Sequence, residues 1–258
     1  MCYDIKVSLE SQLRRAEFLS DEQTIAELKE KLKPFIESNY YHASGYAHPK
    51  ILIYPDSSPF EPLISQWGLI PFWVKDREKK EQLWNGTLNA RGETIFEKPS
   101  FRDSAKNKRC IIILDGFFEH HHYKTKTYPF YIKSKTNKPI HVAGLWSEWV
   151  DKETGEVINS FTIVTTKANR LLGKIHNNPK LTEPRMPLIL SEESVNKWLD
   201  PNDSEGVKTE IQKLIKPWDG EDLVAHTVQR LRGKAALGNV PEAIEKLIYD
   251  ELPEVINE

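Results

Sequence analysis

Five short apolar runs in the middle of the chain constrain its fold most strongly. They are rich in β-branched and aromatic residues and are bounded by Pro, Gly, Asn or Asp, which is typical of strands. Residues 151–155 indicate the turn of a hairpin that joins the runs 143–150 and 157–165. The runs therefore predict a mainly antiparallel β core, and they lie at residues 50–54, 110–114, 128–133, 141–149 and 160–165.

Helical patterns lie on both sides of this region. A capping-box pattern begins at Ser20, and Ile25, Leu28 and Leu32 follow it at helical spacing. Further helices are expected at residues 192–199, 205–216 and 241–252. We therefore expect a single α+β domain over residues 1–258, with two packed sheets or an open barrel at its core and peripheral helices.

The cysteine count and the hydropathy pattern indicate a cellular setting. Two cysteines in 258 residues cannot form a disulfide framework, which fits a reducing compartment. No apolar run approaches the roughly 18 to 20 residues that span a bilayer, and the first residues contain no signal-peptide core. We expect a cytoplasmic, monomeric protein that does not enter a membrane.

The net charge of −2 at pH 7 conceals an uneven distribution along the chain. Residues 101–185 hold fifteen basic and eight acidic side chains, a surplus of seven positive charges, while the remainder carries −9. Either these charges form ordinary solvated faces, or they form a basic cleft that attracts a polyanion. Nucleic acid is therefore not excluded as a partner.

Cys2 is the first candidate for covalent chemistry. Removal of Met1 would leave a residue with both a thiol and an α-amine, and the α-amine has a reference pKa of about 7.7 to 8.0. An aldehyde can condense with the amine, and the adjacent thiol can then close a five-membered thiazolidine ring. The alternative is an inert cysteine, and we expect Cys110, inside an apolar run, to be buried in that way.

Polar residues after the apolar runs offer further groups. Asn89 and Arg91 can orient a nucleophile and clamp a phosphate, or they can belong to a loop with an internal Arg–Glu pair. Glu119 follows a strand and two aromatic residues, where partial burial suits general acid–base work. His176 can exchange protons near neutral pH, although a single histidine is more often structural.

Two other patterns, a run of histidines and an aromatic stretch, have simple structural explanations. Three successive histidines at 120–122 alternate between the faces of a strand and cannot converge on one ion, so we expect no metal and no cofactor. The aromatic stretch 67–73 is expected to be mostly core. An exposed Trp67 or Trp73 could instead stack on an unpaired base.

Taken in this order, the motifs resemble those of the SRAP family, the SOS-response-associated peptidases that covalently shield abasic sites. The resemblance covers most of the chain. It rests on Met1-Cys2 and on the segments 67–76, 89–94, 109–119, 143–149, 165–169, 185–190 and 226–228, together with His176.

The resemblance implies a function and a set of roles. Cys2, freed of Met1 by the protein itself, would crosslink to an abasic site in single-stranded DNA as a thiazolidine, with lyase-like chemistry and slow self-reversal. Asn89 would position the amine or the sugar, and Glu119 and His176 would move protons. The DNA-binding residues would be Arg91, Trp67, Arg185 and Thr165.

Three departures from the family pattern bear on DNA contacts. Tyr3-Asp4 stands where many members have Gly-Arg, so a phosphate contact is absent or is supplied elsewhere. His120 stands where tryptophan is frequent, and residues 177–184 separate His176 from Arg185.

Two alternatives remain open on the sequence. An N-terminal-nucleophile amidohydrolase or cysteine peptidase would also use Cys2, with its α-amine as the base. A non-catalytic module that binds single-stranded DNA would need the basic segment but not Cys2.

Overall fold

The computed structural model describes residues 2–13, 26, 30, 32, 39–202 and 204–253. The helix start expected at Ser20 lies outside these residues. The strands are β1 (Asp4–Val7), β2 (Tyr40–Ser44), β3 (Lys50–Pro55), β4 (Leu63–Trp67), β5 (Asn89–Arg91), β6 (Arg109–Leu114), β7 (Gly116–Tyr123), β8 (Lys126–Ser134), β9 (Ile140–Val150), β10 (Val157–Lys167), β11 (Arg185–Pro187), β12 (Ile189–Leu190) and β13 (Leu223–Thr227).

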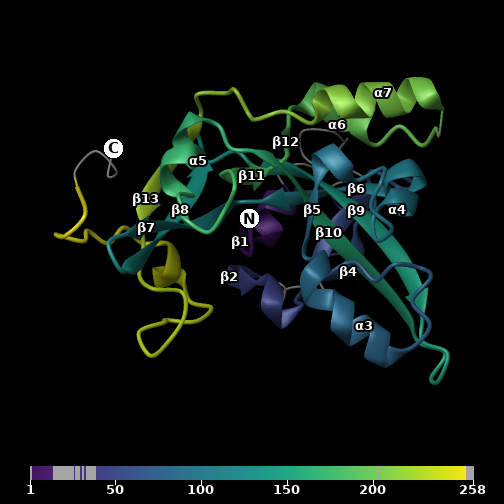
Figure 1. Ribbon diagram of the computed structural model, residues 1–258, viewed down its shortest axis with the longest axis horizontal. Helices are drawn as coiled ribbons and strands as arrows, with labels where there is room; N and C mark the ends of the chain where they lie inside the picture. Colours follow the sequence, from purple (N-terminus) through teal and green to yellow (C-terminus); the bar gives the residue numbers. More distant parts are fainter. Residues whose placement is uncertain are drawn as a thin grey trace.

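Helices are short and lie around the strands (Figure 1). The α-helices whose two ends both lie in described residues are α3 (Arg77–Trp84), α4 (Arg102–Asn107), α5 (Arg170–Ile175), α6 (Glu192–Trp198) and α7 (Glu205–Leu214). Single 3-10 turns are η2 (Gly45–Ala47), η3 (Asn85–Thr87), η4 (Gly92–Thr94) and η5 (Pro241–Ile244). None of the helices in the described part of the chain is long and apolar enough to cross a lipid bilayer.

The strands form two sheets, which confirms the α+β class with a mainly antiparallel core. The smaller sheet has the order β13-β8-β7-β1-β2. In the larger sheet, β10, β4, β3, β6 and β9 pair in turn, and β9 pairs again with β10, so these five strands close into a barrel. The β4–β10 contact is parallel and the other four are antiparallel.

All five predicted strand runs are strands in the structure, because each run is buried along most of its length. The run 110–114 illustrates the reason. In β6, Cys110, Ile112 and Leu114 point into one core cluster, while Ile111 and Ile113 point into a second cluster beneath α6 and α7. A strand buried on both faces reads as a continuous apolar run. The hairpin is confirmed as well, with Val150 opposite Val157.

The expected helix at 241–252 is wrong apart from its first turn. Only η5 is helical, and the chain then continues as an irregular segment. The N–H of Leu247 donates to the carbonyl of Thr227, and the Tyr249 ring packs edge-on against Tyr128 at a centroid distance of 5.0 Å. These contacts to strands β13 and β8 replace the hydrogen bonds that a helix would make.

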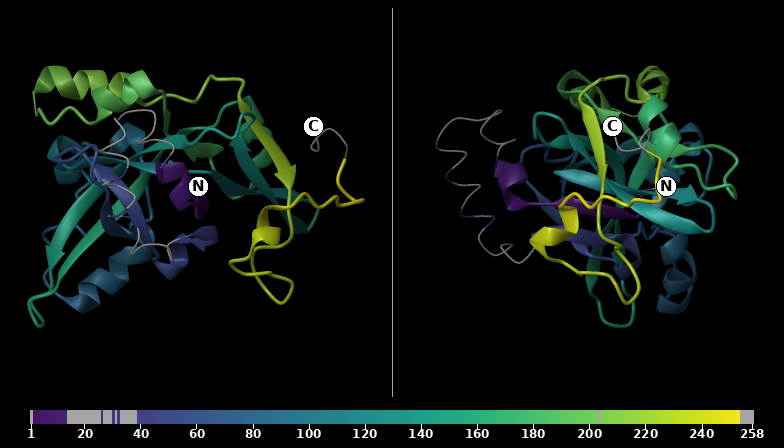
Figure 2. Two further views of the ribbon diagram at one scale, coloured as in Figure 1. Left: turned by 180° about the vertical axis from the view of Figure 1, so that it is seen from behind. Right: turned by 90° about the vertical axis from the view of Figure 1, so that its left-hand side faces the viewer.

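The first strand positions the amino end of the chain. β1 lies between β7 and β2 near the centre of the molecule, with Ile5 and Val7 in the main core (Figure 1). The C-terminal segment lies at the end of the molecule formed by β7, β8 and β13, away from α3 and α7 (Figure 2). The two ends of the described chain therefore approach the same sheet.

Candidate functional site

A cavity of about 450 Å³ opens where β1 begins. In the register of β1 against β7, Asp4 lies opposite Phe118, so the residues just before Asp4 run alongside Glu119. Side chains from the amino end, from β7 and β8, from the segment after α5 and from the segment after β13 surround it. The lining residues are Tyr3, Tyr46, Glu119, His120, His122, Thr127, Pro129, His176, Asn178, Leu181, Arg230, Leu231 and Arg232.

Cys2 is held beside this cavity and is fully buried. Its thiol lies 3.8 Å from the carbonyl oxygen of Asp4, within the range of a weak S–H donor. Burial, reinforced by the charge of Glu119, raises the pKa of the Cys2 thiol well above its ordinary value. The thiol is therefore protonated at neutral pH, and a base must remove its proton before the sulfur can react.

Glu119 and His176 form a buried pair on the wall of the cavity. Glu119 lies on β7, and His176 directly follows α5, whose first turn is capped by Asn169. A carboxylate oxygen of Glu119 lies 3.5 Å from Nδ1 of His176. The same Nδ1 lies 2.9 Å from the carbonyl oxygen of Arg185.

The burial of His176 determines its protonation. Desolvation lowers the pKa of His176, and the nearby Glu119 carboxylate opposes that effect without overcoming it. The imidazole is therefore neutral at neutral pH and can accept a proton. The carboxylate would stabilise the imidazolium that forms, which is the arrangement of a general base with an orienting acid. Glu119 lies close enough to Cys2 for its charge to act on the thiol.

Asn89 has a buried side-chain amide without hydrogen-bond partners among the described residues. It lies on β5, opposite Ile163 of β10. Both polar atoms of its side chain are shielded from solvent, and neither has a hydrogen-bond partner among the described residues. An unsatisfied buried amide costs about 1 to 3 kcal/mol, so a bound polar group that satisfies it would gain in affinity. Asn89 is not among the residues that line the cavity, so a role in binding stays a prediction.

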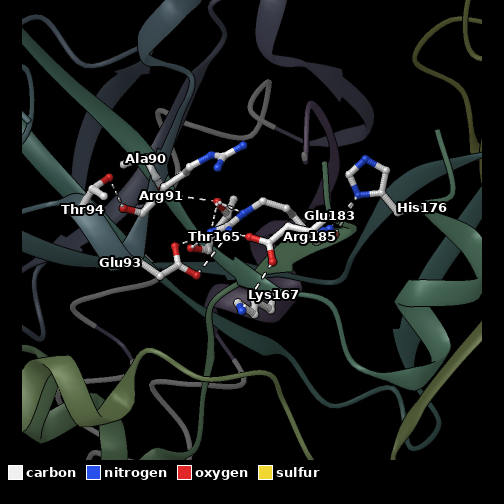
Figure 3. Close-up of polar contacts among 9 residues, drawn as sticks. All are labelled: Ala90, Arg91, Glu93, Thr94, Thr165, Lys167, His176, Glu183 and Arg185. Carbon is white, nitrogen blue, oxygen red and sulfur yellow. Dashed lines mark hydrogen bonds and ion pairs between the residues drawn. The ribbon is translucent and has the colours of Figure 1, made fainter. Parts of the chain in front are cut away.

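Arg185 is buried within a network of protein acceptors and is not open to solvent (Figure 3). Its side chain is 2% exposed, and its Nη2 donates to Glu93 at 2.7 Å and to the carbonyl of Thr165 at 2.8 Å. Its Nη1 donates to the other Glu93 oxygen and to Glu183, both at 3.2 Å. Burial alone would raise the pKa of Glu93, but the bond from Arg185 holds it below its ordinary value.

Three of the four residues expected to contact DNA are buried in the structure. Arg185 directs its guanidinium at protein carboxylates, and Thr165 is fully buried with its hydroxyl donating to the carbonyl of Ala90. Trp67 is fully buried too, and its ring N–H donates to the carbonyl of Leu88 at 2.8 Å. None of these side chains presents a surface to DNA in this structure, and all three support the framework around β10.

Arg91 differs from these three because it is exposed. It ends strand β5, and its side chain points away from Glu93 (Figure 3). The sequence left open an ion pair within the loop, between Arg91 and Glu93. In the structure Glu93 pairs instead with Arg185, 92 residues away. Arg91 remains available to a phosphate.

The three successive histidines face different surroundings. His120 and His122 line the cavity, whereas His121 is buried with its Nδ1 3.0 Å from the carbonyl of Lys174. Within the described ranges, no group of three or more His, Cys, Asp and Glu side chains is placed to hold a metal ion. The side chains at the cavity favour acid–base and nucleophilic chemistry.

The sequence did not identify the other wall of the cavity. Arg230 and Arg232 follow β13, and Arg232 forms an ion pair with Asp4 at 2.6 Å. Burial alone would raise the pKa of Asp4, but the hydrogen bond from His42 and the charge of Arg232 hold it below its ordinary value. The one signal for this contact was the acidic Asp4 at a position where the family often has arginine.

Comparison with known proteins identifies the family of this chain. The family model described as SOS response associated peptidase (SRAP) matches residues 1–235. The chain belongs to the SRAP family. Within this family it is 37% identical over 215 residues to the abasic site processing protein YoqW of Bacillus subtilis, an alignment that covers 82% of this chain and 89% of YoqW.

More distant SRAP relatives and a solved structure extend the similarity. The abasic site processing protein HMCES of Xenopus tropicalis is 30% identical over 215 residues, covering 76% of this chain and 60% of HMCES. A crystal structure of a protein from Bacteroides thetaiotaomicron superposes with a TM-score of 0.78 at 34% identity, covering 96% of this chain and all of that one. This SRAP chain therefore shares both family sequence and family fold.

Proposed function

We propose that this chain processes abasic sites in single-stranded DNA by forming a covalent crosslink through Cys2. The observation that carries the proposal is the position of Cys2. Strand β1 holds it next to the Glu119–His176 pair, at a cavity wide enough for a sugar residue. The SRAP membership and the relatives named as abasic site processing proteins support the same substrate.

The first step in this proposal is the release of the α-amine of Cys2. In the full chain that nitrogen belongs to the peptide bond with Met1, so it cannot condense with an aldehyde. Hydrolysis of this one bond consumes a water molecule and liberates Met1. The neutral His176, oriented by Glu119, would activate the water, which accounts for a peptidase activity directed at the protein itself.

The crosslink then forms in two steps. The amine of Cys2 attacks the aldehyde of the ring-opened abasic sugar, and loss of water gives an imine. The thiol adds across the carbon–nitrogen double bond, so that its proton ends on nitrogen and a thiazolidine ring closes. The raised thiol pKa favours this order, because the amine is the more available nucleophile at neutral pH. Glu119 and His176 would carry the protons in both directions, which also permits slow reversal.

Asn89 and Arg91 would bind the substrate. The unsatisfied amide of Asn89 would hydrogen-bond a sugar oxygen or the amine, and the exposed guanidinium of Arg91 would contact a backbone phosphate. Neither role requires a cofactor.

Intact-mass spectrometry tests the proposal directly. The purified protein is measured before and after addition of a single-stranded oligonucleotide with one abasic site. We expect loss of Met1, followed by an adduct that equals protein plus oligonucleotide minus one water. Cys2→Ala should abolish the adduct, whereas Cys110→Ala, which alters the other buried cysteine, should keep it.

Other outcomes would support the alternatives. DNA binding that is indifferent to the abasic site and to Cys2 would indicate a non-catalytic binding module. Modification of Cys2 by a glutamine-like electrophile, without any DNA adduct, would indicate an amidohydrolase. An adduct that survives Cys2→Ala would refute the proposed chemistry.

A further inference from the structure

The cavity that is lined by the Glu119–His176 pair is also lined by two arginines. Arg230 and Arg232 lie on the segment that follows β13, and both are exposed. Among the described lining residues, they are the side chains with a permanent positive charge. A DNA strand that enters the cavity would therefore meet these two positive charges as well as the Glu119–His176 pair.

Arg232 is fixed in place by two contacts. Its Nη2 lies 2.6 Å from one oxygen of Asp4, whose side chain is only 2% exposed. The other Asp4 oxygen lies 2.9 Å from Nε2 of His42, so the carboxylate cannot swing away with the arginine. On its other side, the guanidinium carbon lies 5.4 Å from the centre of the Tyr46 ring, which packs against Tyr3.

These contacts leave most of the hydrogen-bond donors of the Arg232 guanidinium free to bind a ligand. The Arg232 side chain is 50% exposed, and its Nε and Nη1 make no hydrogen bond with any described residue. Arg185 is the opposite case, because its Nε, Nη1 and Nη2 are all bonded within the protein and its side chain is 2% exposed. An arginine that is held at one corner and open at the other donors is preorganised to bind the oxygens of an anion such as a phosphate.

The position of Arg232 relative to Cys2 suits a phosphate next to the lesion. Its anchor, Asp4, is two residues from Cys2, so their Cα atoms are at most roughly 7 Å apart. An abasic residue has no base to recognise, and contacts to the backbone phosphates therefore have to supply affinity and register.

We propose that Arg232, held by Asp4 and Tyr46, binds a DNA backbone phosphate adjacent to the abasic residue. This inference rests on the proposed function and adds to it a binding residue from the C-terminal segment. It also explains how the chain accommodates an acidic residue at position 4. The cation that binds phosphate here comes from residue 232, and the residue at position 4 orients it.

The test measures non-covalent binding. Fluorescence anisotropy would be recorded with a single-stranded oligonucleotide that carries a tetrahydrofuran residue, which lacks the aldehyde and cannot crosslink. Arg232→Ala should weaken binding about tenfold, as expected for one charge-assisted contact at a half-exposed site. The plot of log affinity against log salt should become shallower by about 0.7, as for one phosphate contact on a single strand.

The chain offers a matched control. Arg77 on α3 is 48% exposed and forms an ion pair with Asp151, whose side chain is 4% exposed, but it does not line the cavity. Arg77→Ala should keep both the affinity and the salt slope. Arg232→Lys, which retains the partner charge for Asp4, should keep the slope and recover only part of the affinity, since a lysine lacks the planar fork.

Any of three results would overturn the inference. The first is an Arg232→Ala protein, folded by its thermal midpoint, with wild-type affinity and salt slope. The second is an equal loss of affinity in Arg77→Ala, and the third is a shallower salt slope in Arg232→Lys. Failure of the wild-type protein to crosslink to aldehyde-containing DNA would instead refute the proposed function and leave the binding result standing.

Discussion

The buried Arg185 network allows a quantitative test of the structure. In Glu93→Gln, the two-point ion pair to Arg185 becomes at best one hydrogen bond to a neutral oxygen. Removing the partner of a buried charge costs about 3 to 5 kcal/mol, and a hydrogen bond to a charged group is worth about 1.5 to 3 kcal/mol. Glu183 still pairs with Arg185, and the Glu93 side chain is 37% exposed, so both values must be reduced. We expect a loss of about 2 kcal/mol in the free energy of unfolding.

Urea unfolding and thermal melting would measure this loss. For a chain of this length, about 2 kcal/mol corresponds to a midpoint lower by roughly 4 to 8 °C. The control is Glu183→Gln, which weakens a contact at 3.2 Å to Nη1 of Arg185 and a second at 3.6 Å to the exposed Lys167, and should cost about 1 kcal/mol or less.

The pH dependence provides an internal check. The pKa of Glu93 is lower in the folded protein than in the unfolded chain, so its contribution is present above the unfolded pKa. This contribution is lost as the pH falls through the folded pKa. The difference between wild type and Glu93→Gln should therefore be full at pH 7 and should shrink in acid, below the ordinary range of a glutamate.

Two results would refute this reasoning. A loss below about 0.5 kcal/mol at pH 7 would mean that the pair stabilises no more than an ordinary surface ion pair. Stronger binding of DNA by Glu93→Gln would mean that Glu93 competes with a phosphate for Arg185, which would make Arg185 a DNA contact after all.

Two further predictions concern the site and its support. Glu119→Gln removes the charge beside His176, so both formation and reversal of the crosslink should slow about 100-fold in gel time courses; unchanged rates would remove Glu119 from the mechanism. Trp67→Phe loses a buried hydrogen bond and volume, and should cost about 2 kcal/mol in urea unfolding with DNA affinity retained. A folded Trp67→Phe protein that binds DNA more weakly would show that the indole does contact the strand.

The strands could be predicted from sequence because the burial of each strand determines the residue types within that same short segment. A run such as 110–114 is apolar at every position since both of its faces are covered. The closure of the barrel could not be predicted, because the parallel pairing of β4 with β10 joins segments more than 90 residues apart. The helix expected at 241–252 failed for the same reason, since contacts with Thr227 and Tyr128 replace local hydrogen bonds.

The site residues also divide into those that the sequence indicates by residue type and those whose contacts depend on partners far away in the sequence. Cys2, Glu119 and His176 stand out in the sequence by residue type, and the structure brings them together. The family resemblance implied a phosphate contact for Arg185, and nothing near it in the sequence indicates that Glu93, 92 positions earlier, is its partner. Arg232 was missed because its anchor, Asp4, lies 228 positions away.

Strand β1 has a consequence for how the amino end can be altered. Its ladder with β7 fixes Asp4 opposite Phe118, and side chains along an extended chain alternate between the two faces. One residue inserted between Cys2 and Asp4 would displace the thiol by about 3.4 Å and turn it to the opposite face. The pairing of β1 with β7 thus fixes both the position and the face of Cys2, two residues before Asp4. Laboratory fusions that preserve the chemistry should be attached at the carboxyl end, and directed evolution of this chain should find residues 2–4 intolerant of any change in length.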